Sequence, residues 1–161
     1  PHAAGMTRKN TLMKKPFVNI KNATARPNDA YRNVIQKIRK DGVCPFCPRY
    51  LAQYHKKPII KTSRFWILTD NMYPYPGAAH HLLLIHKKHI ESIADISPAA
   101  WGELLKLTRT EIKKRRIGGG TFYIRFGDTS HTGASVTHLH ANIISPDIDK
   151  KNRKPILARV G

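Results

Sequence analysis

The sequence predicts a single α+β domain with a mainly antiparallel sheet and two main helices. A chain of 161 residues has the length of one domain with one hydrophobic core. Apolar residues recur at helical spacing in two segments, 28–40 and 97–116. Short apolar runs bounded by turn-forming residues lie between and after these segments, and this order of helix, strands, helix and strands is typical of the α+β class.

Both predicted helices have recognisable ends. The first follows Pro27-Asn28 and is stopped by Gly42. The second opens with Ser97 as a cap and Pro98 at the first helical position, and it ends in the cations of residues 113–116. We expect the second helix to bury an apolar face made of Trp101, Leu104, Leu105, Thr108 and Ile112.

The predicted strands cover residues 62–69, 81–86, 121–126 and 136–144. Turn-forming residues between Pro74 and Gly77 predict a loop between the first two of these strands. A second loop, residues 127–135, is rich in Gly, Ser and Thr. We find no internal repeat and no boundary between two domains.

We expect three regions along the chain. Residues 1–27 read as an expression remnant before Met6 followed by a basic arm, 28–148 as the catalytic domain, and 149–161 as a basic tail. No apolar run reaches the roughly 18 residues that span a bilayer, and no secretory signal is visible, so we expect a cytoplasmic protein.

The charge balance indicates a polyanionic partner. The chain has 29 Lys and Arg against 10 Asp and Glu, a formal net charge of +19. Nucleotides, nucleic acid and acidic surfaces all fit this charge, and a role in solubility alone stays open.

The stretch VTHLHANII, residues 136–144, carries the candidate chemistry. In a strand, His138, His140 and Asn142 would share one face, with Leu139, Ala141 and Ile143 on the other. Three polar side chains in a row fit the floor of a polar pocket better than a core face, and a solvated edge strand is the alternative. Just upstream, the turn at residues 133–135 is suited to aiming backbone N–H groups at a phosphate. An imidazole can attack phosphorus when an acceptor, such as a main-chain carbonyl, holds its other nitrogen.

Cys44 and Cys47 are spaced C-x-x-C. In a reducing compartment this spacing suggests half of a metal site or a redox pair rather than a structural bridge. Two small buried thiols are the alternative, and a redox pair is disfavoured because no helix clearly begins at Cys44.

Three motifs, in this order, resemble the histidine triad (HIT) superfamily of nucleotide hydrolases and transferases. They are TDNMYPYPGAAHHLLLIHKKHIESI (residues 69–93), GASVTHLH (133–140) and HLHANII (138–144), and the last matches His-x-His-x-His-x-x at two of its three histidines. The resemblance covers roughly residues 30–146 and implies a HIT-like fold. It also implies a two-fold homodimer.

The resemblance implies a role for each matching residue. His140 would be the nucleophile that takes the α-phosphate and forms a covalent nucleotidyl-histidine. Gly133, Ser135 and Asn142 would hold the phosphate oxygens, and Asn71 would face the ribose.

Two departures from the family pattern bear on the reaction. Asn142 replaces the third histidine, and an amide can donate a hydrogen bond but cannot hand over a proton near neutral pH. This opens a phosphorylase or transferase reading beside a hydrolase. Arg125 stands where many members have Asn or Gln, and it would either bind a further phosphate or be a solvated strand arginine.

In zinc-bearing members, the resemblance implies a structural Zn²⁺ ion held by Cys44, Cys47, His89 and His138. His86 is a rival ligand, because it stands where the family usually has proline.

We therefore expect a nucleotide-processing enzyme acting at the α-phosphate of a nucleoside or dinucleoside polyphosphate, or of a phosphoramidate. One alternative is a nucleic-acid-binding protein that uses the basic arm, residues 113–116 and the tail. Another is a pocket on the same fold that senses nucleotides without turning them over.

Overall fold

The computed structural model describes residues 15–24, 28–151, 154–158 and 160. In this part of the chain a five-stranded sheet, all of whose neighbouring strands pair antiparallel, is combined with helices, which confirms the predicted α+β class. The strand order is β1-β2-β3-β5-β4. The strands are β1 Ile59–Thr62, β2 Trp66–Asp70, β3 Ala78–His86, β4 Thr121–Arg125 and β5 His140–Pro146. The helices are α1 Ile20–Thr24, α2 Asp29–Asp41, α3 Pro48–Tyr54, α4 Pro98–Lys114 and α5 Thr129–Thr132, with a 3₁₀ turn η1 at Ile93–Asp95.

The two predicted helices are α2 and α4. The side chain of Asn28 accepts a hydrogen bond from Tyr31 N at 3.0 Å, and Gly42 ends α2 in the left-handed conformation, with φ of 65°. Ser97 accepts from Ala100 N at 3.2 Å at the start of α4. Local capping chemistry therefore sets these helix ends.

The predicted strand over residues 62–69 was wrong in its extent. The chain turns at residues 63–65, so β1 ends where we placed the start of one strand and β2 begins after the turn. The carboxylate of Glu103, on α4, accepts hydrogen bonds from the Ser63 hydroxyl and from Phe65 N. A contact 40 residues away thus stabilises the turn, which a local pattern cannot reveal.

The apolar face predicted for α4 was wrong for Trp101, Leu105 and Ile112, which are exposed. The buried face consists of Ala100, Leu104, Leu107, Thr108 and Glu111. The sheet covers only one side of α4, and the apolar residues of this helix extend around it beyond the side that the sheet covers. Burial of Glu111 is tolerated because its carboxylate accepts from Arg115 Nε at 3.1 Å.

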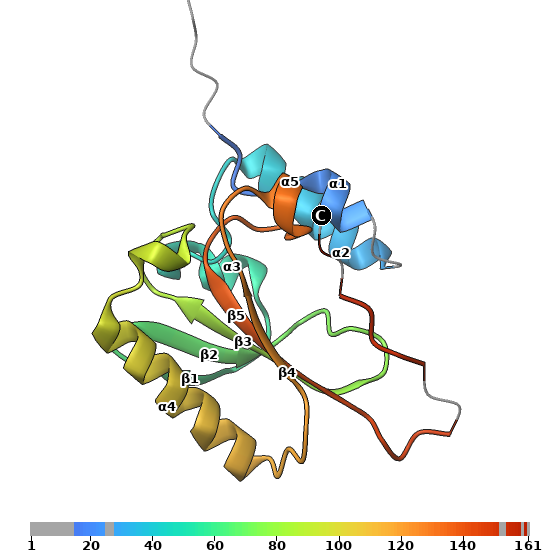
Figure 1. Ribbon diagram of the computed structural model, residues 1–161. Coiled ribbons are helices and arrows are strands. Elements are labelled where there is room, and N and C mark those ends of the chain that lie inside the picture. The colour runs from blue at the N-terminus through green and yellow to red at the C-terminus, as the bar shows by residue number, and fades with distance from the viewer. Residues whose placement is uncertain (1–14, 25–27, 152–153, 159, 161) are drawn as a thin grey trace, which may run out of the picture.

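The two faces of the sheet carry different layers. Alternate residues of β3, Leu82 and Leu84, pack with α4 in the main core, while Leu83 and Ile85 pack against Leu51 of α3 on the opposite face. Figure 1 shows α4 lying across the sheet, with α1, α2 and α5 gathered away from it. The second face is therefore only partly filled by α3, and it is there that the pocket forms.

Part of the expected basic arm belongs to the folded structure. Val18 is buried and forms an isolated antiparallel bridge with Val136. Val18 and Ala23 share a core cluster with Ile35 and Ile38 of α2. The rest of the arm, residues 1–14 and 25–27, lies outside the described residues.

Among the helices of the described residues, none combines the length and apolar character that crossing a membrane requires.

Candidate active site and metal site

The strand register places the candidate residues on one face of the sheet. His140 on β5 pairs with Ile85 on β3 and with Arg125 on β4. Two residues further along β5, Asn142 pairs with Leu83 and with Tyr123. Directly opposed residues of antiparallel strands point to the same side, so His140 and Asn142 form the floor of one pocket.

The predicted strand 136–144 began too early. The chain bends at His138 and β5 starts at His140, so His138 does not share the pocket face with the other two polar residues. The segment before β5 is instead held by long-range contacts, among them Leu139 N donating to Ile90 O at 2.8 Å. The prediction for the opposite face is confirmed, because Leu139, Ala141 and Ile143 all lie in the main core.

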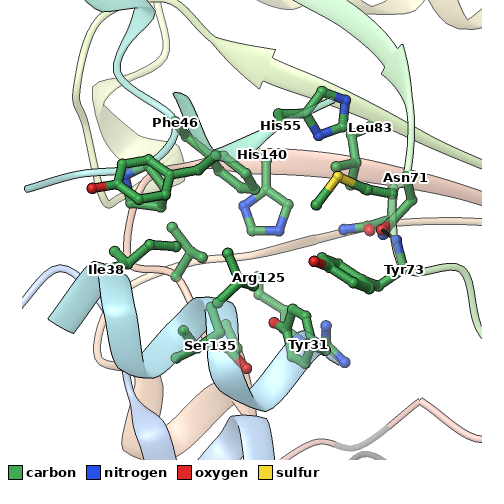
Figure 2. A pocket seen from close by; sticks show the side chains of 18 of the residues that line it. Tyr31, Ile38, Phe46, His55, Asn71, Tyr73, Leu83, Arg125, Ser135 and His140 are labelled. Atoms are coloured by element: carbon green, nitrogen blue, oxygen red, sulfur yellow. Dashed lines mark hydrogen bonds between the residues drawn. The ribbon is translucent and has the colours of Figure 1, made fainter. Parts of the chain in front are cut away.

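The pocket occupies about 770 Å³, its open mouth included. Figure 2 shows the ring of His140 pointing into its centre, with Phe46 and Ile38 on one side and Asn71 and Tyr73 on the other.

A main-chain carbonyl holds the ring of His140. Its Nδ1 lies 2.8 Å from the carbonyl oxygen of His138. A carbonyl only accepts, so Nδ1 carries the proton and Nε2 keeps its lone pair. The edge-to-face contact with Phe46, at 5.0 Å between ring centroids, further restrains the ring.

The turn at residues 133–135 also lines the pocket. Gly133 ends α5 with φ of 66°, a left-handed conformation that suits glycine. Helix α1 fixes the turn from behind, since Asn22 Nδ2 donates to Ala134 O at 2.7 Å. Immediately before the helix, Asn19 N donates to Ser135 O at 2.9 Å. The residues of this turn that we expect to bind phosphate thus line the same pocket as His140.

Asn142 and Asn71 converge on one histidine, His81. The Oδ1 atom of Asn142 and the Nδ2 atom of Asn71 each lie 3.0 Å from His81 Nε2. Asn71 Oδ1 accepts from Tyr73 N at 2.8 Å, which shapes the loop after β2. Both asparagines line the pocket.

Arg125 lies at the pocket beside two phenols. Its guanidinium donates to the hydroxyl of Tyr123 at 3.3 Å and to that of Tyr75 at 3.5 Å, and it lies over the Tyr123 ring. Burial alone would lower the pKa of Arg125, but the two tyrosines outweigh it and the pKa is raised. A cation that is half buried at this position faces the same space as His140.

Several pocket residues were not among the candidates that the sequence predicts. Tyr31 on α2 and Tyr73 in the loop after β2 meet with ring centroids 5.1 Å apart, and both line the pocket. His55, just after α3, lines it too, and burial lowers the pKa of His55. The His55 Nε2 atom lies 2.8 Å from the Thr69 hydroxyl. Tyr73 lies in a loop, where an aromatic residue follows no periodic pattern. Tyr31, by contrast, stands at helical spacing in the apolar pattern of α2.

The four residues expected to bind metal form a cluster. The ligand atoms of Cys44, Cys47, His89 and His138 lie within 4.8 Å of one another. The Nδ1 atoms of the two histidines are 3.1 Å apart, and His138 Nδ1 lies 3.3 Å from Cys44 Sγ. Tetrahedral zinc bonds have edges of about 3.3–3.8 Å between ligands, so this arrangement could hold a metal ion.

Hydrogen bonds around the cluster determine which histidine nitrogens can face a metal ion. His138 Nε2 donates to the His86 carbonyl at 2.5 Å, which leaves Nδ1 with its lone pair toward the cluster. The rival ligand His86 is not in the cluster, because its own Nδ1 contacts Lys88 O at 2.8 Å. Burial lowers the pKa of His138 to about 4 and raises the pKa of the Cys44 thiol to about 12. A cation bound here would offset the cost of a buried thiolate.

The comparisons with known proteins support the fold described above. The family described as "scavenger mRNA decapping enzyme C-term binding" matches residues 43–156. A histidine triad nucleotide-binding protein from Candida albicans superposes with a TM-score of 0.54 at 17% identity, over 73% of this chain and 86% of that one. A histidine triad protein from Clostridium difficile gives 0.52 at 20% identity, over 70% and 95% of the chains. A zinc-bound histidine triad family protein from Mycobacterium smegmatis gives 0.52 at 16%, over 73% and 82%. The search of curated protein sequences found no match.

The fold and the site thus define a protein of the histidine triad class, as the motifs predicted. The chain belongs to the scavenger mRNA decapping enzyme C-terminal family of the histidine triad superfamily, since that family matches most of its length. At the level of this superfamily, the class is that of nucleotide hydrolases and transferases.

Proposed function

We propose that the chain is an enzyme that transfers the nucleotidyl group of its substrate, through the α-phosphorus, to His140 and then to an acceptor. The observation that carries the proposal is the hydrogen bond from His140 Nδ1 to the His138 carbonyl, 2.8 Å long. It leaves Nε2 as the nucleophile, on a ring that points into a pocket lined by polar and aromatic side chains (Figure 2).

The surrounding residues supply the binding functions. The turn containing Gly133 and Ser135, together with the Asn142 amide, would donate to the non-bridging oxygens as negative charge builds there. Asn71 would face the ribose, and the aromatic wall of Tyr31 and Tyr73 would pack against the base.

The experiment uses His140→Ala and a library of nucleoside polyphosphates, dinucleoside polyphosphates and phosphoramidates. We expect turnover by the wild-type chain, no turnover by the variant, and a nucleotide-protein adduct detected by mass spectrometry only in the wild type. Thermal unfolding of both proteins shows that the fold is intact. Unchanged turnover in His140→Ala would refute the assignment. Binding by the wild type without turnover would indicate a nucleotide sensor.

The acceptor is tested in the same assay. An amide at position 142 favours a phosphorylase or transferase, so we expect inorganic phosphate or a second nucleotide to accelerate product release beyond the rate in water. Equal rates would identify a hydrolase.

We propose zinc as the ion of the Cys44, Cys47, His89 and His138 cluster, because two thiolates and two imidazoles are the donor set that Zn²⁺ prefers. The ion would join the start of α3 to the segment before β5, and thereby fix the carbonyl that holds His140. Metal analysis of protein purified without chelators should give about one zinc per chain.

An exposed apolar surface supports the homodimer. Leu105, Trp101 and Phe122 are 60%, 38% and 45% exposed and line one shallow hollow. Phe122 lies on β4, which in the described part of the chain is an edge strand. A second copy would cover both the apolar residues and the strand edge. Phe122→Glu should convert a dimer to a monomer in sedimentation analysis; a wild-type monomer would refute this part.

A second candidate function is nucleic-acid binding. Lys106, Arg109 and Lys113 are exposed at helical spacing on α4, and none forms an ion pair with another described residue. Such a stripe suits a phosphate backbone, and binding would fall steeply with salt. Replacing all three by Glu should abolish binding to a short duplex while free-nucleotide turnover persists. Equal binding by the variant would dismiss this role.

A further inference from the structure

The amide of Asn142 has a donor that the folded chain does not use. Asn142 is only 3% exposed, and within the described residues its Nδ2 atom is buried with no hydrogen-bond partner. A buried donor without a partner costs about 1–3 kcal/mol, so its retention needs an explanation. The residue lines the same pocket as His140, where a ligand can supply the missing acceptor.

His81 fixes the direction of this amide. Tyr75 N donates to His81 Nδ1 at 3.2 Å, so in the neutral ring the proton sits on Nε2. That Nε2–H donates to Asn142 Oδ1 at 3.0 Å. The nearby Asn71 amide therefore does not donate to the same nitrogen. The stacked ring of Tyr75, 5.1 Å from His81, holds the imidazole in place. With its oxygen held by His81, Asn142 presents only N–H groups elsewhere.

An N–H group of this kind stabilises a phosphate oxygen but does not deliver a proton to a leaving group. His55 and Tyr73, which also line the pocket, are poorly suited to replace it as an acid. Hydrogen bonding to Thr69 occupies Nε2 of His55, whose pKa burial lowers, so this ring is neutral near pH 7. Burial raises the pKa of Tyr73, which makes this phenol a weaker acid still. A leaving group that departs as a stable anion needs no such acid.

We propose that this pocket selects nucleotides whose α-phosphate is joined to another phosphate, and discriminates against the same nucleotides joined to an amine. This inference rests on the proposed function. His140 Nε2 forms a bond to the α-phosphorus, and the bond from phosphorus to the bridging oxygen breaks. The electron pair leaves on that oxygen as phosphate or polyphosphate, and the proton on His140 Nδ1 stays against the His138 carbonyl. A phosphorus–nitrogen bond would instead release an amine anion unless a proton arrived.

The position of Arg125 fits the same leaving group. It is the β4 partner of His140 in the strand register, and its guanidinium is held between the hydroxyls of Tyr75 and Tyr123. A cation there would neutralise charge on the departing phosphate, whereas it offers nothing to a departing amine.

The experiment compares a dinucleoside triphosphate with the 5′-phosphoramidate of the same nucleoside, using adenosine and guanosine. The wild-type chain should give a larger kcat/KM for the triphosphate. Asn142→His places an acid at this position, and we expect the rate with the phosphoramidate, relative to the triphosphate, to rise about 10- to 100-fold, the range of general acid catalysis.

The outcomes separate this inference from the proposed function. A wild-type preference for the phosphoramidate, or an equal change of both rates in Asn142→His, overturns the inference while leaving His140 as the nucleophile. If the wild-type chain turns over neither substrate, or His140→Ala retains turnover, the proposed function falls and the inference falls with it.

His81 is the positioning residue, and its test separates positioning from packing. His81→Gln keeps an N–H donor for Asn142 Oδ1, whereas His81→Leu fills the space without one. We expect His81→Leu to lower kcat with the triphosphate about tenfold or more at nearly unchanged KM, and His81→Gln to restore most of it. Thermal unfolding shows that both variants are folded. If their activities are equal, His81 serves only in packing, and its proposed role in positioning Asn142 is refuted.

Discussion

Removal of one ligand from the Cys44, Cys47, His89 and His138 cluster should lower the thermal stability of the protein by an amount that metal binding determines. His89→Ala is the best perturbation, because this side chain is only half buried and its loss leaves a small cavity. The ligand atoms are already gathered, with 3.1 Å between the two Nδ1 atoms, so binding needs little rearrangement.

The magnitude follows from linkage. Free metal at 100 times its dissociation constant stabilises the folded state by about 2.7 kcal/mol. In a chain of 161 residues, each kcal/mol moves Tm by roughly 2–4 °C, so the loss should be about 5–11 °C. The assay is thermal unfolding with and without a chelator.

The matched control is His131→Ala, which removes an exposed histidine outside the cluster. The chelator should lower Tm of the wild type and of His131→Ala, and leave His89→Ala unchanged. If chelation leaves the wild-type Tm where it was, or His89→Ala still responds, the reasoning is refuted.

Three further predictions concern stability, measured by urea unfolding. Hydrogen bonds from Ser63 and the turn backbone outweigh the effect of burial and lower the pKa of Glu103 below 4.5; their contribution is present above that pH and lost as pH falls through the lowered pKa. Glu103→Gln should therefore cost about 1–2 kcal/mol at pH 7, and a deficit that persists undiminished at pH 3 would contradict this. Arg115→Met leaves the carboxylate of Glu111, 4% exposed, without its cation and should cost about 3 kcal/mol, which the added change Glu111→Gln should partly recover; no recovery would speak against the ion pair. Leu104→Ala, at a core residue 1% exposed, should cost about 2–5 kcal/mol, and an equal effect of Leu157→Ala, at an exposed residue, would argue against this core.

Much of the fold could be predicted because its signals are local. The caps at Asn28 and Ser97 and the glycine after α2 act within one helical turn, so the sequence shows them directly. The alternation of Leu139, Ala141 and Ile143 marks a core face for the same reason. The failures involve tertiary contacts. The position of the sheet decides which side of α4 is buried, and Glu103 on α4 helps to hold the turn between β1 and β2.

The candidate site was likewise predicted only in part. The motif identifies His140, and C-x-x-C identifies a pair of thiols, because the order of residue types along the chain is enough for both. The sequence did not place His138 off the pocket face, or His81 against Asn142, or the aromatic wall of Tyr31 and Tyr73.

By itself, the sequence determined the class of protein and the two main helices, and it pointed to the imidazole that we propose as the nucleophile. The tertiary structure alone decided how the reactive groups are held. The carbonyl behind His140 depends on a bend, and the amide direction at Asn142 depends on a histidine 61 positions away. Periodicity reports which side of an element a residue occupies, whereas hydrogen-bond partners depend on strand register and packing between distant segments.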